Sequence, residues 1–276
     1  MRMLLHSKRT ARPVRLPQQL FLCALYASLL STLLGTLFAS ALNTQQLEPT
    51  DVGMLQNVMK TLEPGVEARK KDGTANLMTW QELYAPLSQE QRALLDEFRK
   101  LRAETLGATS HFFGETVTGP ELVPVGEQYV MKDDTKTLLD PQFLPRAALE
   151  AYQRMMDAMQ ADIGRRLLVE SGYRSPAYQL YLFLYYLPKH HVSIIETNRF
   201  VALPGHSEHG YPPRQAIDFI NEDGINGEDH PEQFEALPEY QWLRSRATEF
   251  HFALSYPRDN VYQTAFEPWH WHYEGS

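Results

Sequence analysis

The hydrophobic periodicity of the chain changes character near Phe200. Before that point, apolar residues recur at the spacing of amphipathic helices, most clearly over 145–163 and 176–187. After it, short apolar stretches such as QAIDFI, HFALSY and PWHWHY alternate with turn-rich loops, which is the pattern of strands. Helices followed by short strands indicate an α+β fold.

A smaller helical region is predicted ahead of this part, over 48–107. Thr79–Glu82 and Ser88–Gln91 are both capping boxes, which mark the first turn of a helix. A stretch with Gly, Thr and Pro follows and indicates an irregular linker over 108–129. We therefore expect a helical region, a linker and then the main domain over 130–276.

The first 41 residues are basic, then apolar, then small. Five Lys and Arg and no acid occur there, the apolar run extends from Leu20 to Phe38, and Ala39–Ala41 follows. This order predicts a secretory signal cleaved after Ala41. Because the run approaches the roughly 20 residues that span a bilayer, an uncleaved N-terminal membrane anchor is the alternative. Both place the rest of the chain outside the cytoplasm, in the periplasm or cell envelope.

The part that follows the first 41 residues is acidic. Without those five basic residues, 21 Lys and Arg face 34 Asp and Glu, a formal balance of −13. Such a surface repels nucleic acid, so nucleic-acid binding is excluded. The single cysteine, Cys23, lies in the apolar run, so the exported part has no disulfide.

Histidines concentrate in the last third of the chain. Asp218 lies in an apolar stretch, where an unpaired buried carboxylate would be costly and a metal ion would be a suitable partner. Catalytic zinc takes three ligands from His, Asp or Glu and leaves one position for water. His209, Asp218 and one histidine of the terminal EPWHWHY would form such a set, with Glu267 as the base. Six of the ten histidines lie in this third: His206, His209, His230, His251, His270 and His272.

Other interpretations of these residues stay open. GHSEH resembles the G-x-S-x-G turn of serine hydrolases, although His209 replaces its second glycine. NEDGINGEDHPEQFE resembles a calcium loop with its glycine out of register, so a solvated loop near the site entrance is favoured. Asp218 could instead pair with Arg214, and Glu267 could be an ordinary surface carboxylate. We expect packing or supporting roles for His206, His251 and His272, and solvated side chains for His190 and His191.

Five short motifs occur in the order seen in VanY-type zinc D-alanyl-D-alanine carboxypeptidases. They are SGYRSPAYQ at 171–179, PGHSEH at 204–209, AIDF at 216–219, HFALSYP at 251–257 and EPWHWHY at 267–273. The resemblance covers about residues 130–276. It implies a hedgehog/D,D-peptidase-like fold, with a small antiparallel sheet flanked by helices, that holds one zinc ion.

The resemblance also implies roles for individual residues. Glu267 would be the catalytic base, and Arg174 would steady the substrate carboxylate or the developing oxyanion. The implied reaction is metal-assisted hydrolysis of peptidoglycan stem peptides, with release of the terminal D-alanine. The positions that match the zinc ligands are His209, Asp218 and His270, and those that would line the substrate site are Arg174, Gln179 and Ser207.

The chain departs from the family pattern between the first two ligands. Asp218 follows His209 by nine residues, where family members have seven, and YPPRQ replaces a glycine turn. Added loop length costs little entropy, so a bulged loop could absorb the difference. The position of His272 is often arginine in the family. A non-catalytic cell-wall-binding protein with an altered site is therefore the alternative from another class, and a D,D-dipeptidase or endopeptidase is the alternative within the fold.

Overall fold

The structure is a computed structural model in which residues 42–276 form one compact unit. The signal or anchor predicted over 1–41 lies, except for Ala41, outside the described residues. Among the described residues, we find no helix with the length and apolar character needed to cross a membrane. The structure describes residues 41–115, 121–132, 134–228, 230–262 and 264–275.

Three α-helices form most of the N-terminal region, and two of them begin at the predicted capping boxes. At the start of α3, the Thr79 hydroxyl accepts from the backbone of Glu82, whose carboxylate accepts from the backbone of Thr79. The same reciprocal bonds join Ser88 and Gln91 at the start of α4. Each such cap satisfies backbone donors that the first turn leaves free, which fixes where the helix begins. The helices are α2 (Pro49–Lys71), α3 (Trp80–Tyr84) and α4 (Gln89–Lys100).

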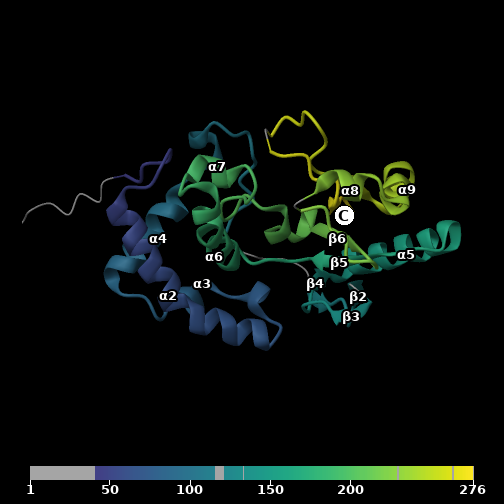
Figure 1. Cartoon of the computed structure of the whole chain (residues 1–276), viewed down its shortest axis with the longest axis horizontal. Coiled ribbons are helices and arrows are strands. Elements are labelled where there is room, and N and C mark those ends of the chain that lie inside the picture. Colours follow the sequence, from purple (N-terminus) through teal and green to yellow (C-terminus); the bar gives the residue numbers. More distant parts are fainter. Residues whose placement is uncertain (1–40, 116–120, 133, 229, 263, 276) are drawn as a thin grey trace, which may run out of the picture. The chain divides into compact units, whose positions relative to one another are not determined.

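These helices pack against α6 (Pro176–Tyr186) and α7 (Ile194–Asn198), as Figure 1 shows. Phe98 of α4 meets Phe183 of α6 edge to face, with ring centroids 6.3 Å apart. In the aromatic run of α6, Phe183 is therefore part of the core, whereas Tyr185 is 57% exposed. The shared core also includes Leu55, Val58, Leu62, Leu95, Leu180 and Leu184.

A four-stranded antiparallel sheet with the order β5-β6-β8-β7 carries the C-terminal part. The α+β class and the strands predicted from QAIDFI, HFALSY and PWHWHY are thereby confirmed. The pairing of β5 with β6 shifts between Val169 and Ser171, a bulge that brings Ser171 opposite Asp218. The strands are β5 (Leu167–Ser171), β6 (Ala216–Asn221), β7 (Phe252–Leu254) and β8 (His270–Tyr273).

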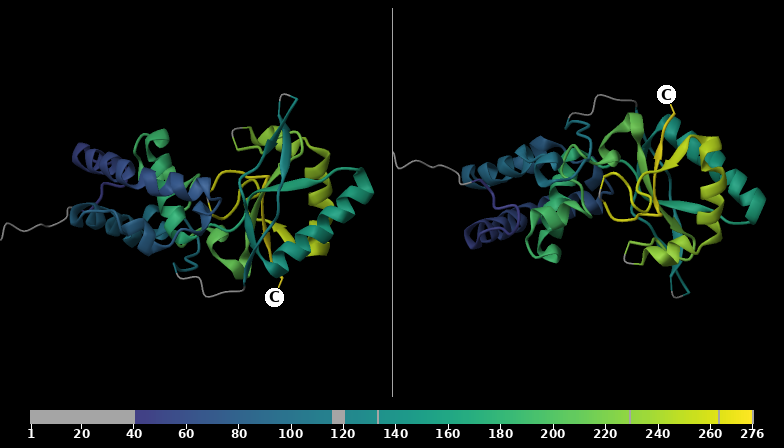
Figure 2. Two further views of the ribbon diagram at one scale, coloured as in Figure 1. Left: turned by 90° about the horizontal axis from the view of Figure 1, so that it is seen from below. Right: turned by 90° about the horizontal axis from the view of Figure 1, so that it is seen from above.

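A second core joins this sheet to α5 (Arg146–Ile163) and α9 (Pro238–Arg246), which lie beside it in Figure 2. The predicted helix over 145–163 is thus confirmed, and it ends at Gly164 with φ +68°, a conformation that favours glycine. Each fully buried large apolar side chain contributes about 1.5–3 kcal/mol, so this packing holds the strands rigidly. The core includes Met155, Met156, Met159, Phe219, Trp242 and Trp271, and the short α8 (Pro231–Glu235) supplies Phe234.

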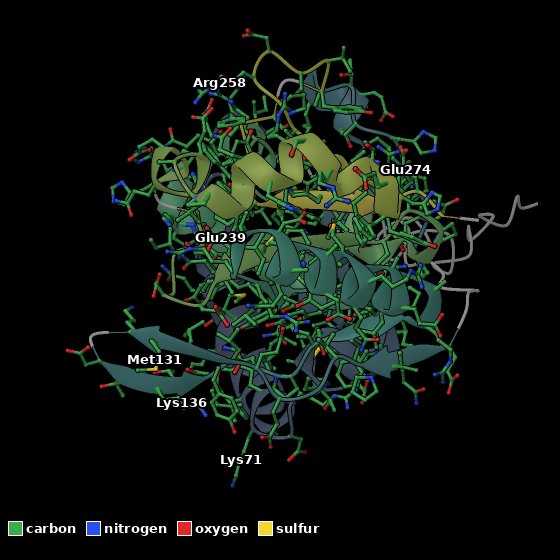
Figure 3. All side chains as sticks on the ribbon, turned by 90° about the vertical axis from the view of Figure 1, so that its right-hand side faces the viewer. Lys71, Met131, Lys136, Glu239, Arg258 and Glu274 are labelled. Carbon is green, nitrogen blue, oxygen red and sulfur yellow. The ribbon has the colours of Figure 1, made fainter. Side chains whose placement is uncertain are left out.

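Short strands precede α5. β1 (Leu122–Pro124) pairs with β4 (Phe143–Pro145), and it lies inside the stretch for which the sequence indicates an irregular linker. A strand of three residues has too few positions to show a period, and its partner comes about twenty residues later. β2 (Tyr129–Lys132) and β3 (Thr135–Leu138) form a hairpin, on which Figure 3 labels Met131 and Lys136.

Candidate metal centre

Two histidines and one aspartate present their ligand atoms to one another. One atom from each of His209, Asp218 and His270 lies within 4.8 Å of the other two. Asp218 on β6 and His270 on β8 are directly opposite in the sheet register, and His209 comes from the short 3-10 turn Glu208–Gly210. Within the part of the chain that the structure describes, no other group of three His, Cys, Asp or Glu residues meets this condition.

The ring of His209 is fixed by the backbone of Gly172. Its Nδ1 lies 2.7 Å from the carbonyl oxygen of Gly172, which can only accept, so Nδ1 carries the hydrogen. Nε2 therefore presents its lone pair, 3.0 Å from Asp218 Oδ2. A Cβ at position 172 would lie 2.6 Å from the Phe143 carbonyl oxygen, so glycine is needed for this close approach.

The ring of His270 lies between two carboxylates. Its Nδ1 is 2.8 Å from Asp218 Oδ1, and its Nε2 is 3.1 Å from Glu208 Oε2. His270 is 5% exposed and His209 is 0% exposed, so neither ring can rely on water for its partners. The rings meet edge to face, with centroids 4.9 Å apart.

Two buried atoms of this group lack hydrogen-bond partners. Among the described residues, neither His209 Nε2 nor Asp218 Oδ1 makes a hydrogen bond of acceptable geometry, although His209 Nε2 lies 3.0 Å from Asp218 Oδ2 and Asp218 Oδ1 lies 2.8 Å from His270 Nδ1. A buried polar group without a partner costs about 1–3 kcal/mol. A cation held between the three side chains would remove that cost, and two imidazoles plus one carboxylate are a donor set suited to zinc.

The electrostatics of the metal-free site differ between the two histidines. Burial, reinforced by the charge of Arg174, lowers the pKa of His209 to about 4, which keeps its ring neutral. Burial alone would lower the pKa of His270 as well, but Asp218 and Glu208 outweigh it and raise the value to about 10. Burial alone would raise the pKa of Asp218, yet the two histidines hold it well below its usual range. A metal would therefore displace a proton from His270.

Glu267 lies beside the donor group, three residues before β8. Its Oε2 is 3.7 Å from His270 Nδ1, and its side chain is 14% exposed. Burial raises the pKa of Glu267 to about 8, and the charge of Asp218 adds to this. A carboxyl group with a pKa near neutrality can both accept and return a proton.

The other predicted site residues lie in the same cleft, which has a volume of about 1070 Å³. Arg174 follows β5, and its Nη2 lies 3.8 Å from Asp218 Oδ2. Gln179 on α6 donates from Nε2 to the Ala202 carbonyl, while its Oε1 has no partner among the described residues. Ser207 precedes the turn that carries His209. The lining includes His209, Asp218, His270, Glu267, Arg174, Gln179 and Ser207.

The cleft reaches beyond the metal centre towards α6 and α7. His190 is half-buried there and stacks on Phe200 with centroids 4.8 Å apart, so the predicted solvated side chain is only partly exposed, whereas His191 is exposed as predicted. The aromatic ring covers part of His190, a contact that its place in the sequence did not indicate. His206 is buried and bonds to Ser110, as expected, whereas His251 is exposed rather than packed.

Sequence reasoning missed a buried ionic network next to the metal centre. Glu208 is 4% exposed and accepts from Arg214 Nε at 2.7 Å and from the Ser255 hydroxyl at 2.5 Å. Arg214 therefore pairs with Glu208, and not with Asp218 as the alternative proposed. Burial alone would raise the pKa of Glu208, but His270 and Arg214 hold it far below its usual range. The available signal was a carboxylate directly before a ligand candidate, with an arginine six residues later.

The structure also decides between the alternatives for the two decoy motifs. Ser207 precedes a 3-10 turn, so the strand-to-helix turn of a serine hydrolase is not formed there. In the acidic stretch, Asn221 Oδ1 accepts from the backbone of Asp223 and Ile225, which makes it part of a turn. Glu228 and Pro231 line the cleft, in agreement with a loop at the site entrance.

The C-terminal half of the chain matches a known protein family. Residues 141–276 match the family VanY: D-alanyl-D-alanine carboxypeptidase. YodJ of Bacillus subtilis (strain 168), which is named as a candidate carboxypeptidase, is 28% identical over 182 residues, or 58% of this chain. The match covers 63% of YodJ, so the chain spans less than two thirds of that relative.

Solved structures of peptidases are also similar to part of this chain. A mutant VanY D,D-pentapeptidase from a VanB-type vancomycin resistance cassette, in complex with Zn(II), is 27% identical with a TM-score of 0.40. That match covers 49% of this chain and 74% of the other. The LdcB LD-carboxypeptidase is 24% identical with a TM-score of 0.47, over 63% of this chain and 78% of the other.

Proposed function

Residues 141–276 belong to the VanY family of D-alanyl-D-alanine carboxypeptidases, and from this premise we propose that the protein is a zinc-dependent peptidase that releases the terminal D-alanine of peptidoglycan stem peptides. The observation that carries the proposal is the group of three donor side chains within 4.8 Å, in a cleft that also holds a buried carboxyl group and an arginine. Family membership alone suggests the substrate, and the donor group suggests how it is cut.

His209 through Nε2, His270 through Nδ1 and the carboxylate of Asp218 would hold the zinc ion. When bound, zinc lowers the pKa of a water ligand towards neutrality and polarises a substrate carbonyl. The unpartnered His209 Nε2 and Asp218 Oδ1 support this assignment, because both atoms are buried and a cation would satisfy them.

Glu267 would be the general base and then the general acid. It takes a proton from the attacking water as the water oxygen bonds to the carbonyl carbon of the scissile amide. It then gives that proton to the amide nitrogen as the carbon–nitrogen bond breaks, which releases D-alanine and the shortened peptide. The pKa of about 8 in the metal-free chain supports both steps, since a group poised near neutrality can transfer a proton in either direction.

Arg174 would stabilise negative charge on the substrate. Its guanidinium lies 3.8 Å from Asp218 and lines the cleft, where it can reach either the terminal carboxylate or the oxyanion. Gln179 and Ser207 would bind the peptide from the same lining.

The N-terminal signal or anchor would place this activity in the periplasm or cell envelope, where stem peptides occur. The basic, apolar and small-residue order of the first 41 residues supports export. The acidic balance of the remaining chain fits a substrate that is not a nucleic acid.

The direct test is to incubate the purified protein with a stem pentapeptide, with zinc or with a chelator, and to weigh the products. Loss of one alanine mass only in the presence of zinc is the expected result. A stem tetrapeptide with a single terminal D-alanine separates D,D- from L,D-cleavage, and a cross-linked dimer tests for endopeptidase activity. Retention of the peptide without any release would instead identify a cell-wall-binding protein.

A further inference from the structure

We propose that Glu208 is a positioning residue for the metal centre, because its carboxylate orients the ring of His270 and decides which ring nitrogen faces the ion. This inference rests on the proposed metal binding. Glu208 is not placed to act on the substrate itself, since its two oxygens are occupied by other side chains. Its effect would reach the reaction only through His270.

The hydrogen bond between Glu208 and His270 fixes the tautomer. Glu208 Oε2 lies 3.1 Å from His270 Nε2, and an ionised carboxylate can only accept. Nε2 must therefore carry the hydrogen. In a neutral imidazole the lone pair is then on Nδ1, which is the nitrogen 2.8 Å from Asp218 Oδ1. A metal-bound histidine commonly has such a carboxylate on its other nitrogen, where it orients the ring.

Two further donors hold Glu208 in this orientation. Arg214 Nε donates to Oε1 at 2.7 Å, and the Ser255 hydroxyl donates to Oε2 at 2.5 Å. Glu208 is only 4% exposed, so little water competes with these partners. The carboxylate is held from two separate segments, one before β6 and one after β7, and it cannot rotate away from His270 without losing both bonds.

The loop between His209 and Asp218 thereby contributes to the centre through Arg214. Arg214 Nη2 also lies 3.4 Å from His272 Nδ1, and that nitrogen is 3.8 Å from Glu208 Oε2. Position 272 is therefore close enough to Glu208 for an arginine placed there to supply a guanidinium in place of Arg214. The role of the loop can therefore be tested by moving the positive charge from position 214 to position 272.

The first test measures zinc affinity by competition with a chromophoric chelator in wild type, Glu208→Ala and Glu208→Gln. We expect a loss of about 10- to 100-fold in Glu208→Ala. The loss in Glu208→Gln should be smaller, since its amide oxygen can still accept from Nε2–H. Nitrogen-15 NMR of the zinc-bound proteins should show the hydrogen of His270 on Nε2 in wild type and Glu208→Gln, and a mixture of forms with the hydrogen on Nε2 or on Nδ1 in Glu208→Ala.

Glu239→Ala is the matched control. Glu239 on α9, labelled in Figure 3, is also a buried carboxylate with an arginine partner, since Arg165 Nη1 lies 3.4 Å away. Its removal should lower stability without a change in zinc affinity or in the His270 tautomer. Wild-type affinity and tautomer in a folded Glu208→Ala variant would overturn the inference.

A second pair of variants covers the case in which Glu208→Ala does not fold. Arg214→Ala removes a side chain that is 32% exposed and should weaken zinc binding several-fold. Arg214→Ala with His272→Arg should recover part of that loss, whereas wild-type affinity in Arg214→Ala would contradict the proposed support of Glu208. A wild-type protein that binds no zinc would refute the proposed function. A wild-type protein that binds zinc and hydrolyses the peptide, but whose zinc affinity does not change on substitution of Glu208, would refute this inference alone.

Discussion

Asp218 and His270 face each other across the β6–β8 pair, with Asp218 Oδ1 2.8 Å from His270 Nδ1. Directly opposite residues in an antiparallel pair have their Cβ atoms about 4.5–5.5 Å apart, so the sheet register itself brings these two side chains together. The third metal-binding side chain, His209, reaches them from a turn. The hydrogen bond from its Nδ1 to the Gly172 carbonyl oxygen fixes the direction of its ring. Two donors thus depend on strand pairing, and one depends on a loop.

Substitution of Glu267 separates metal binding from turnover. Glu267→Gln should keep zinc, because the three donor side chains are unchanged, but it should lose about 10²- to 10⁴-fold in turnover, the usual effect of removing a general base. His270→Ala should lose both zinc and turnover. Elemental analysis and D-alanine release measure the two quantities.

Glu150→Gln is the control for this comparison, since Glu150 is an exposed carboxylate on α5. It should match wild type in both measurements. Unimpaired hydrolysis by Glu267→Gln would refute the assignment of the base, whatever its metal content.

Removal of zinc should lower the thermal stability of the protein. An ion that binds only the folded chain raises the free energy of unfolding, so a chelator should reduce Tm and added zinc should restore it. The effect should shrink as the pH falls from 7.5 to 5, because a proton at His270, whose metal-free pKa is about 10, competes with the ion more strongly in acid. Scanning calorimetry at both pH values measures this, and a zinc-dependent shift in Tm that is equal at pH 7.5 and 5 would contradict histidine ligands.

Glu170, which lines the same cleft but is not a proposed ligand, provides a test of pH-dependent stability. Burial raises its pKa from 4.5 to about 7, although Asn226 Nδ2 donates to it at 2.7 Å. The folded chain therefore binds this proton more tightly than the unfolded chain. The resulting stabilisation is fully present below pH 4.5 and is lost as the pH rises through 7.

Glu170→Gln removes this dependence while it keeps an acceptor for Asn226. The free energy of unfolding of the variant minus that of wild type should be about 2 kcal/mol larger at pH 8 than at pH 4. A shift of one pKa unit corresponds to about 1.4 kcal/mol, and we reduce the total because the side chain is only partly buried. Urea unfolding at the two pH values measures the difference. The same difference at pH 4 and pH 8 would show that Glu170 titrates normally.

Local signals in the sequence predicted the helices and the main strands. The capping boxes of α3 and α4 act within four residues, and the periodicity of α5 follows from one buried face, so both can be read without knowledge of the fold. β1 could not be predicted in this way, because its only support is a distant partner strand. The sequence resemblance selected residues that the structure brings to one cleft, and their catalytic roles stay predictions.

The network around Glu208 could not be predicted for a different reason. It combines Glu208 and Arg214, which lie six residues apart before β6, with Ser255, which follows β7 and meets them only after β6, β7 and β8 have paired. Residue types alone do not tell which arginine reaches which carboxylate, since the chain contains many of both. His190 shows the same limit, because its stacking on Phe200 depends on how α6 and α7 pack.

Gly172→Ala tests whether the backbone behind His209 sets metal affinity. The new Cβ would lie 2.6 Å from the Phe143 carbonyl oxygen, so the backbone must shift, at a cost of about 1–3 kcal/mol. Because the Gly172 carbonyl accepts from His209 Nδ1, the same shift should also weaken zinc binding. Gly53→Ala in α2 is the matched control: nothing lies within 4 Å of its added Cβ, so it should gain about 0.5–1 kcal/mol and bind zinc as wild type does. Equal zinc affinities in the two folded variants would mean that His209 is held in place without the help of Gly172.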